Sequence, residues 1–130
     1  MSTLKKIMHV EDDPSIQQVT KIALEAVGGF QVHTCPSGAD ALEHYSQFEP
    51  QLLLMDVMMP DMDGPETLRQ LQQHYDLSAV PVIFMTAKVQ SNEVQSYKDL
   101  GAADVVVKPF DPMTLSQQIE AIWQRAIANE

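Results

Sequence analysis

The sequence is poor in cysteine and in basic residues, and each shortage excludes a class of protein. Cys35 is the only cysteine among 130 residues, so the chain can form no internal disulfide and no cluster of thiolate metal ligands. Lysine and arginine number 8 against 18 aspartates and glutamates, a formal net charge of -10. Because such a surface repels phosphate backbones and anionic lipid, we expect no direct binding to nucleic acid or to membranes.

Long hydrophobic runs are also absent. No apolar run approaches the roughly 20 residues that a membrane-spanning helix needs, and the apolar stretch within the N-terminal MSTLKKIMHVEDD is too short for the core of a signal peptide. We therefore expect a cytoplasmic protein. A length of 130 residues with 45% hydrophobic and 20% charged residues is typical of one globular domain. We predict a single domain over residues 1–130.

Short apolar runs alternate with segments whose hydrophobic residues recur at helical spacing, which predicts alternating strands and helices. The runs 52–55 and 105–107 do not alternate apolar with polar residues, as expected of parallel strands covered on both faces. With right-handed crossovers, the pattern predicts an α/β fold with a doubly wound, open parallel sheet. The predicted strands are 7–10, 30–34, 52–55, 82–85 and 105–107.

The predicted helices have recognisable starts. Asp13-Pro14 and Asp111-Pro112 each place a capping carboxylate before a proline at the first helical position, and Gly28-Gly29 is expected to end the first helix. Three further helices are predicted from Gly64-Pro65, from a cap at Ser91, and over 39–46. The expected apolar faces are Ile16, Val19, Ala23 and Val27 in the first helix, Leu68, Leu71 and Tyr75 in the third, Val94, Tyr97 and Leu100 in the fourth, and Leu115, Ile119, Ile122 and Ala126 in the last.

Polar residues follow the predicted strands. Glu11 and Asp12 come after the first, Asp56 after the third, Thr86 at the end of the fourth and Lys108 after the fifth. Ligand sites of open parallel sheets lie beyond the carboxyl ends of the strands, so we expect these side chains to converge. Grouped carboxylates repel one another and need a cation. Hard oxygen ligands of this kind suit Mg²⁺.

Asp56 is the candidate nucleophile of this edge. It follows a wholly apolar strand and precedes a turn, so its carboxylate is expected to point outward and to be able to attack a phosphoryl group. Lys108 would offset the charge on the phosphoryl oxygens, and the Thr86 hydroxyl would bond one of them. No second base is evident, so hydrolysis of the aspartyl phosphate is expected to be slow.

At these residues the sequence resembles a response-regulator receiver domain of two-component signalling, similar to the stand-alone chemotaxis receivers. The resemblance covers essentially the whole chain and depends on several short motifs in a fixed order. They are VEDDP at 10–14, DVMMPDMDG at 56–64, MTA at 85–87, and Gly101-Ala102, Asp104 and Lys108-Pro109-Phe110 near the end.

The resemblance implies a (βα)5 flavodoxin-like fold with strand order 2-1-3-4-5 and phosphorylation of Asp56 by a sensor histidine kinase or a histidine phosphotransfer protein. It implies Mg²⁺ held by Asp12 and Asp56, by Glu11 through water, and by the main-chain carbonyl of Met58, and a cis bond between Lys108 and Pro109. Such a domain is not an enzyme beyond its own phosphotransfer and slow dephosphorylation. We expect a monomer or weak dimer. Phosphorylation is expected to shift a surface that binds an unidentified downstream protein.

Three positions vary within the family or depart from its pattern. Val105 stands where receivers usually have an aromatic residue that turns inward on activation, and valine has no ring to turn, so the switch is not expected in its usual form. Met58 and Lys88 occupy positions that tune the phosphate lifetime. An apolar Met58 is expected to shield the acyl phosphate from water.

Other interpretations remain open. A pseudo-receiver that is never phosphorylated is the main alternative; a dehalogenase-type phosphatase would need a second acid where Met58 stands. Asp61 and Asp63 are expected to shape a loop rather than to bind metal. The 4 histidines share no metal-ligand spacing, and we expect structural or exposed roles for them. Trp123 is expected to pack in the core.

Overall fold

The computed structural model describes residues 3–87 and 90–128, so Lys88 lies outside the described residues. Its centre is a parallel five-stranded sheet in the order β2-β1-β3-β4-β5, which confirms the predicted topology. Each strand lies within a residue or two of its predicted position. The strands are β1 (Lys6–Val10), β2 (Gln31–Cys35), β3 (Leu52–Asp56), β4 (Val82–Thr86) and β5 (Asp104–Val107).

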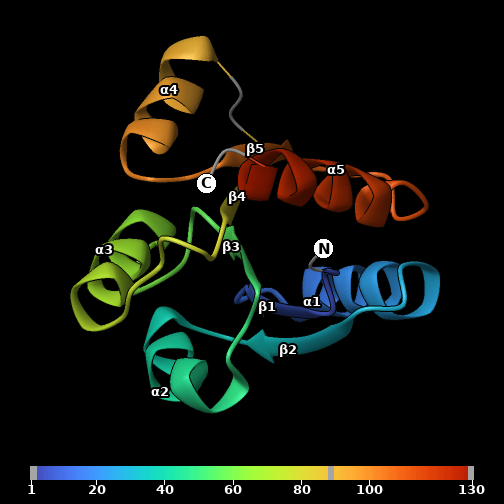
Figure 1. Cartoon of the computed structure of the whole chain (residues 1–130), viewed down its shortest axis with the longest axis horizontal. Helices are drawn as coiled ribbons and strands as arrows, with labels where there is room; N and C mark the ends of the chain where they lie inside the picture. Colours follow the sequence, from blue (N-terminus) through green and yellow to red (C-terminus); the bar gives the residue numbers. More distant parts are fainter. Residues whose placement is uncertain (1–2, 88–89, 129–130) are drawn as a thin grey trace.

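Helices cover both faces of the sheet (Figure 1). One face is covered by α1 (Pro14–Lys21), its π-helical continuation η1 (Ile22–Val27), and α5 (Leu115–Ala128). The other is covered by α2 (Gly38–Phe48), α3 (Gly64–His74) and α4 (Ser91–Asp99). No helix in the described ranges has the length and apolar character needed to cross a bilayer.

The core consists of two hydrophobic layers separated by the sheet. Every residue of β3 and β4 is buried, as their apolar runs predict for strands covered on both faces. Leu54 of β3 belongs to the layer under α5, which includes the buried Trp123, whereas Leu53 belongs to the layer under α2 and α3. This alternation anchors β3 from both sides and fixes the position of Asp56 at its end.

The predicted inner face of the first helix is partly wrong. Thr20, Ala23 and Leu24 are buried, whereas Val19 is 42% and Val27 is 43% exposed. The residue of α1 that faces the sheet at this point is Thr20 and not its neighbour Val19. Beyond it, the helix widens into the π-helical turn η1, whose extra residue rotates Val27 outward. The helix ends where predicted, with Gly29 at φ 75.

Two other helices begin differently from the prediction. Asp111 caps a turn, with its carboxylate accepting from the Met113 N–H at 2.9 Å, and α5 begins only at Leu115. The N-cap of α4 is Gln90 rather than Ser91, and no side-chain hydrogen bond caps it. The described side chains of α4 include no buried residue, so this helix is held to the sheet by less buried surface than the others.

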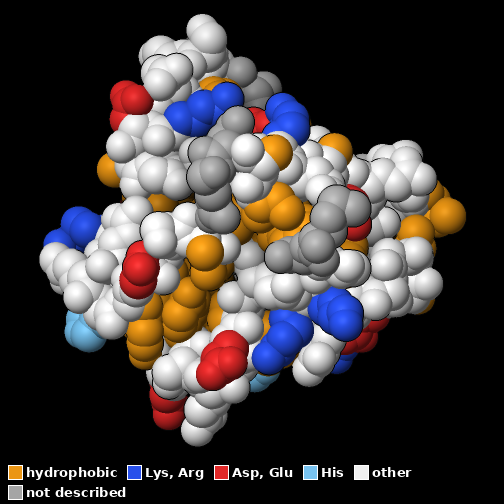
Figure 2. All heavy atoms as spheres, viewed as in Figure 1, with side chains coloured by type: hydrophobic (Ala, Val, Ile, Leu, Met, Phe, Trp, Pro, Cys, Tyr) orange, Lys and Arg blue, Asp and Glu red, His pale blue; other side chains and the backbone are white. Residues whose placement is uncertain are grey.

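The α2 and α3 helices pack against each other on one face of the sheet. The rings of Tyr45 and Tyr75 meet there with centroids 4.5 Å apart. Figure 2 shows hydrophobic side chains reaching the surface between these two helices, while charged side chains are scattered over the rest of this view. The Asp63 carboxylate caps α3 by accepting from the Glu66 N–H at 2.9 Å, which confirms that the helix starts at Gly64.

Candidate functional site

The carboxyl ends of the strands bring the predicted site residues together at one edge of the sheet. Asp56 ends β3 and lies beside Met85, and Thr86 ends β4 beside Val107. Glu11 directly follows β1, and its N–H donates to the carbonyl of Cys35 at 2.9 Å. The N–H of Lys108 donates to the Thr86 carbonyl at 2.9 Å. Residues far apart in the sequence therefore meet because parallel strands end on the same side.

Lys108 places a cation at this edge. Its Nζ donates to Asp56 Oδ1 at 2.8 Å and to Glu11 Oε1 at 2.9 Å. Burial acts to lower the pKa of Lys108, but the hydrogen bonds to Asp56 and Glu11 outweigh it and the pKa is raised. The Lys108-Pro109 peptide bond is cis, as the resemblance implied. Lys108 is thus a protonated ammonium held between two carboxylates.

Three carboxylates lie close together at this edge. Oxygens of Glu11, Asp12 and Asp56 lie within 4.8 Å of one another. Burial raises the pKa of Glu11 to about 7, although its hydrogen bond to Lys108 acts in the opposite direction. A divalent cation with oxygen ligands fits this set of closely spaced carboxylates.

The site is a small hollow open to solvent. Its volume is about 330 Å³, and Glu11, Asp12, Asp56, Met58, Thr86 and Lys108 all line it. Asp56 is 5% exposed and Thr86 is 4% exposed, whereas Met58 is 73% exposed at the rim. The hollow thus places a nearly buried carboxylate and a hydroxyl beside a lysine, with room for one small anion.

The loop from Val57 to Gly64 supports Asp56 from behind. The Gly64 N–H donates to the Val57 carbonyl at 2.9 Å, which closes the loop. A Cβ on Gly64 would lie 2.4 Å from the Asp56 carbonyl oxygen and 3.1 Å from Val57 Cα. Since both neighbours are backbone atoms, only glycine allows the start of α3 to approach so closely.

Gly64→Ala is therefore expected to lower the free energy of unfolding by about 1 to 3 kcal/mol, measured by urea denaturation. Gly29→Ala is the matched control. A Cβ there meets no atom within 4 Å, and only the positive φ of 75 opposes it, at about 1 kcal/mol. If Gly64→Ala were no less stable than the control, the close approach at Asp56 would not constrain the fold.

Two residues of the site were not singled out from the sequence as site residues. Gln17 of α1 donates from Nε2 to the Glu11 carbonyl at 2.6 Å. Tyr97 of α4 shares a side-chain hydrogen bond with Thr86, and its ring packs edge-on against Phe84 with centroids 5.3 Å apart. The sequence marked Tyr97 only as an apolar position of a helix. No local pattern reveals that its hydroxyl reaches the end of β4.

Comparison with known proteins identifies the family. The family described as the response regulator receiver domain matches residues 7–120. The chain belongs to this family. Among curated relatives of this receiver, the transcriptional regulatory protein CseB of Streptomyces coelicolor is 38% identical over 125 residues, covering 96% of this chain and 52% of that protein. The alkaline phosphatase synthesis transcriptional regulatory protein PhoP of Bacillus subtilis is 34% identical, with coverages of 94% and 50%.

Solved structures agree with this assignment. The chemotaxis response regulator CheY4 of Vibrio cholerae superposes with a TM-score of 0.84 at 28% identity, covering 92% of this chain and 99% of that one. A receiver domain of a signal transduction histidine kinase from Syntrophus aciditrophicus gives a TM-score of 0.79 at 30% identity, with coverages of 93% and 91%. This receiver spans about half the length of the two curated relatives described above.

Family membership fixes the general role. The chain is a receiver domain of two-component response regulators, a signalling module rather than an enzyme that turns over a separate substrate. Receiver domains typically bind Mg²⁺ at an acidic pocket, and the cluster of Glu11, Asp12 and Asp56 is an acidic pocket of that kind.

Proposed function

We propose that this receiver takes a phosphoryl group onto Asp56 from a phosphohistidine of a sensor histidine kinase or histidine phosphotransfer protein in the cytoplasm. The observation that carries the proposal is the 2.8 Å contact between Asp56 Oδ1 and Lys108 Nζ inside a hollow that Glu11, Asp12 and Thr86 also line. This arrangement supplies a nucleophile, a charge-compensating cation and a hydroxyl to one phosphoryl group.

In the proposed transfer, an Asp56 oxygen forms the new bond to phosphorus as the bond to the donor imidazole nitrogen breaks. The donor histidine takes up a proton as it leaves. As negative charge shifts from the Asp56 carboxylate to the phosphoryl oxygens, the Lys108 ammonium moves to one of these oxygens. The Thr86 hydroxyl donates to another. Among the described residues that line the hollow there is no histidine to activate water, and we expect the acyl phosphate to persist.

Mg²⁺ is the cofactor that we assign to the acidic pocket. Glu11, Asp12 and Asp56 would hold it, together with the main-chain carbonyl of Met58, and when bound it supplies positive charge to the phosphoryl oxygens. Among the described residues, the ammonium of Lys108 contacts Glu11 and Asp56 of the three clustered carboxylates. Phosphorylation adds further negative charge to this group, so the divalent cation and Lys108 are both needed to offset it.

Removal of Mg²⁺ tests this part of the proposal. In acetyl phosphate and Mg²⁺, intact mass spectrometry is expected to show a gain of one phosphoryl group. In excess EDTA the gain should be at least about 10-fold slower, because the carboxylates then repel the incoming phosphoryl oxygens. Equal rates with and without Mg²⁺ would remove the metal from the proposal. No gain in either condition would favour the alternative, a pseudo-receiver that binds partners without phosphorylation.

The phosphodonor protein needs a surface beside the site. An apolar hollow of about 390 Å³ adjoins Lys108 and is lined by Ser15, Ile16, Val19, Ala87, Pro109 and Phe110. We propose that the helix carrying the donor histidine docks here, because the hollow shares Lys108 with the acidic pocket and so places its occupant next to Asp56. The exposed Val19 of α1 then makes an intermolecular contact instead of a core contact.

The output step involves α4. With Val105 in place of an aromatic residue, the ring that reaches Thr86 is that of Tyr97, through their side-chain hydrogen bond. Tyr97 and Val105 pack against the same hydrophobic layer. We propose that the phosphoryl group draws the Thr86 hydroxyl away from Tyr97. Because the described side chains of α4 are not buried, loss of this bond would loosen the helix and change the surface that a downstream protein binds.

Tyr97→Phe tests the output step. The variant lacks the hydroxyl, so α4 amide hydrogen exchange is expected to be faster before phosphorylation and to change less upon it. Phosphoryl gain from acetyl phosphate should be unchanged. Tyr75→Phe removes a comparable hydroxyl, bonded to the Leu42 carbonyl at 3.4 Å, and should leave α4 exchange as in the wild type. A full phosphorylation-dependent change in Tyr97→Phe would exclude Tyr97 from the relay.

A further inference from the structure

Two of the four histidines lie close together at the β2 edge of the sheet. His33 lies on the edge strand β2 and His44 on α2. Their ring centroids are 5.3 Å apart, with the planes inclined by 39°. Their separation in the sequence is not typical of a metal-binding motif. They meet because α2 packs over β2. This pair plays no part in the proposed phosphoryl transfer.

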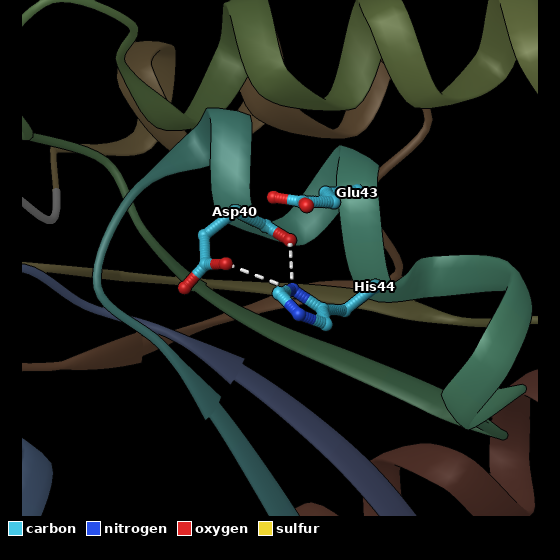
Figure 3. Close-up of side chains that lie close together, drawn as sticks. All are labelled: Asp40, Glu43 and His44. Atoms are coloured by element: carbon cyan, nitrogen blue, oxygen red, sulfur yellow. Dashed lines mark hydrogen bonds and ion pairs between the residues drawn. The ribbon is translucent and has the colours of Figure 1, made fainter.

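His44 is held in one orientation by Asp40, one turn earlier on α2 (Figure 3). Its Nδ1 lies 2.9 Å from the Asp40 carbonyl oxygen and 2.8 Å from Asp40 Oδ1. Since both partners are acceptors, Nδ1 carries a hydrogen, and in the neutral ring Nε2 has the free lone pair. Metal-binding histidines commonly show this arrangement, in which a carboxylate or carbonyl fixes the tautomer and orients the ring.

The charge around His44 also favours a cation. Carboxylate oxygens of Asp40 and Glu43 and a ring nitrogen of His44 lie within 4.8 Å of one another. Figure 3 shows Asp40 and Glu43 on the same part of α2 as His44. All of these side chains, including His33, are at least partly accessible to solvent. A divalent ion can therefore reach the imidazoles without unfolding the chain.

We propose that His33 and His44 form a binding site for a divalent late transition metal such as Zn²⁺, with Asp40 orienting His44 and Glu43 supplying negative charge nearby. Two imidazoles bound at about 2 Å to one tetrahedral ion place their ring centres about 5 Å apart, so the 5.3 Å between the ring centres of His33 and His44 leaves room for one shared ion. Waters complete the coordination. Imidazole nitrogen prefers zinc, nickel or copper over Mg²⁺, so the histidine site is not expected to take the Mg²⁺ that we assign to the acidic pocket.

Calorimetric titration of Zn²⁺ into the whole chain tests the proposal, at about pH 8 because protons compete with the metal for imidazole. Excess Mg²⁺ is present throughout to occupy the acidic pocket. Wild type is expected to bind one Zn²⁺. His33→Gln and His44→Gln should each weaken the affinity at least about 10-fold, and Asp40→Asn by about 10-fold, as loss of an orienting partner does. Circular dichroism checks that each variant is folded.

His74→Gln is the matched control. His74 also sits on a helix and places Nδ1 2.9 Å from the carbonyl of the residue one turn earlier, Gln70, but its ring contact is with Tyr75. Its loss should leave Zn²⁺ affinity unchanged. The proposal is overturned if wild type binds no Zn²⁺ under these conditions, if the His33 and His44 variants bind as wild type does, or if His74→Gln weakens binding equally.

Discussion

Asp56→Asn is expected to lose phosphoryl acceptance from acetyl phosphate, with a rate below about 1% of wild type, because an amide oxygen is a far weaker nucleophile than a carboxylate. The fold should be retained. Asparagine has nearly the shape of aspartate, and its side-chain oxygen can still accept a hydrogen bond from Lys108, as Asp56 Oδ1 does at 2.8 Å. Intact mass spectrometry over time, with Mg²⁺ present, measures the rate.

Asp61→Asn is the control for this substitution. It makes the same chemical change in the loop that follows Asp56, on an exposed side chain. Asp61 has a φ of 68, a conformation that asparagine tolerates as well as aspartate does. The control is expected to be phosphorylated at the wild-type rate. Comparable rates for Asp56→Asn and wild type would show that another residue accepts the phosphoryl group.

Lys108→Met is expected to slow phosphoryl acceptance about 100-fold. Loss of one preorganised donor to the developing charge commonly has an effect of this size, and methionine keeps the length of the side chain without its charge. The substitution also leaves the carboxylates of Glu11 and Asp56 without the ammonium that now contacts both. The pKa of Glu11 should rise further as a result, because the hydrogen bond to Lys108 now acts to lower it. The rate with acetyl phosphate at saturating Mg²⁺ is the measurement.

Lys98→Met provides the comparison for Lys108→Met. Lys98 lies in the last turn of α4 and is exposed, so the same change of side chain there alters the net charge equally but not the charge at Asp56. Its rate should be that of wild type. A Lys108→Met rate within a few-fold of wild type, at equal stability, would mean that the ammonium acts in positioning or in output and not in the transfer.

The strands and their order could be predicted because short apolar runs bounded by polar residues are a strong local signal. The same logic predicted the edge where Glu11, Asp56, Thr86 and Lys108 meet, because strand ends in a parallel sheet converge whatever the details of packing. The apolar face of α1 could not be predicted in full. Its sheet-facing row contains Thr20, a polar residue, and η1 changes the helical period after Lys21.

Contacts between side chains of different helices and strands could not be predicted from the sequence either. Tyr97 meets Thr86, and His33 meets His44, only because α4 and α2 pack at particular angles on the sheet. Neither pair is marked by spacing in the sequence. The sequence shows that position 105 has no aromatic residue. It does not show that Tyr97 is the aromatic residue that reaches Thr86.

We expect Asp56 itself, and no other residue, to carry the phosphoryl group. An aspartyl phosphate is reduced by borohydride to homoserine, so wild type is incubated with acetyl phosphate and Mg²⁺, reduced, digested and sequenced by mass spectrometry. Homoserine is expected at position 56 and at no other aspartate, and it is expected to be lost when EDTA replaces Mg²⁺. Homoserine at Asp12 or Asp61 instead, or no homoserine in a sample that has gained a phosphoryl group, would contradict it.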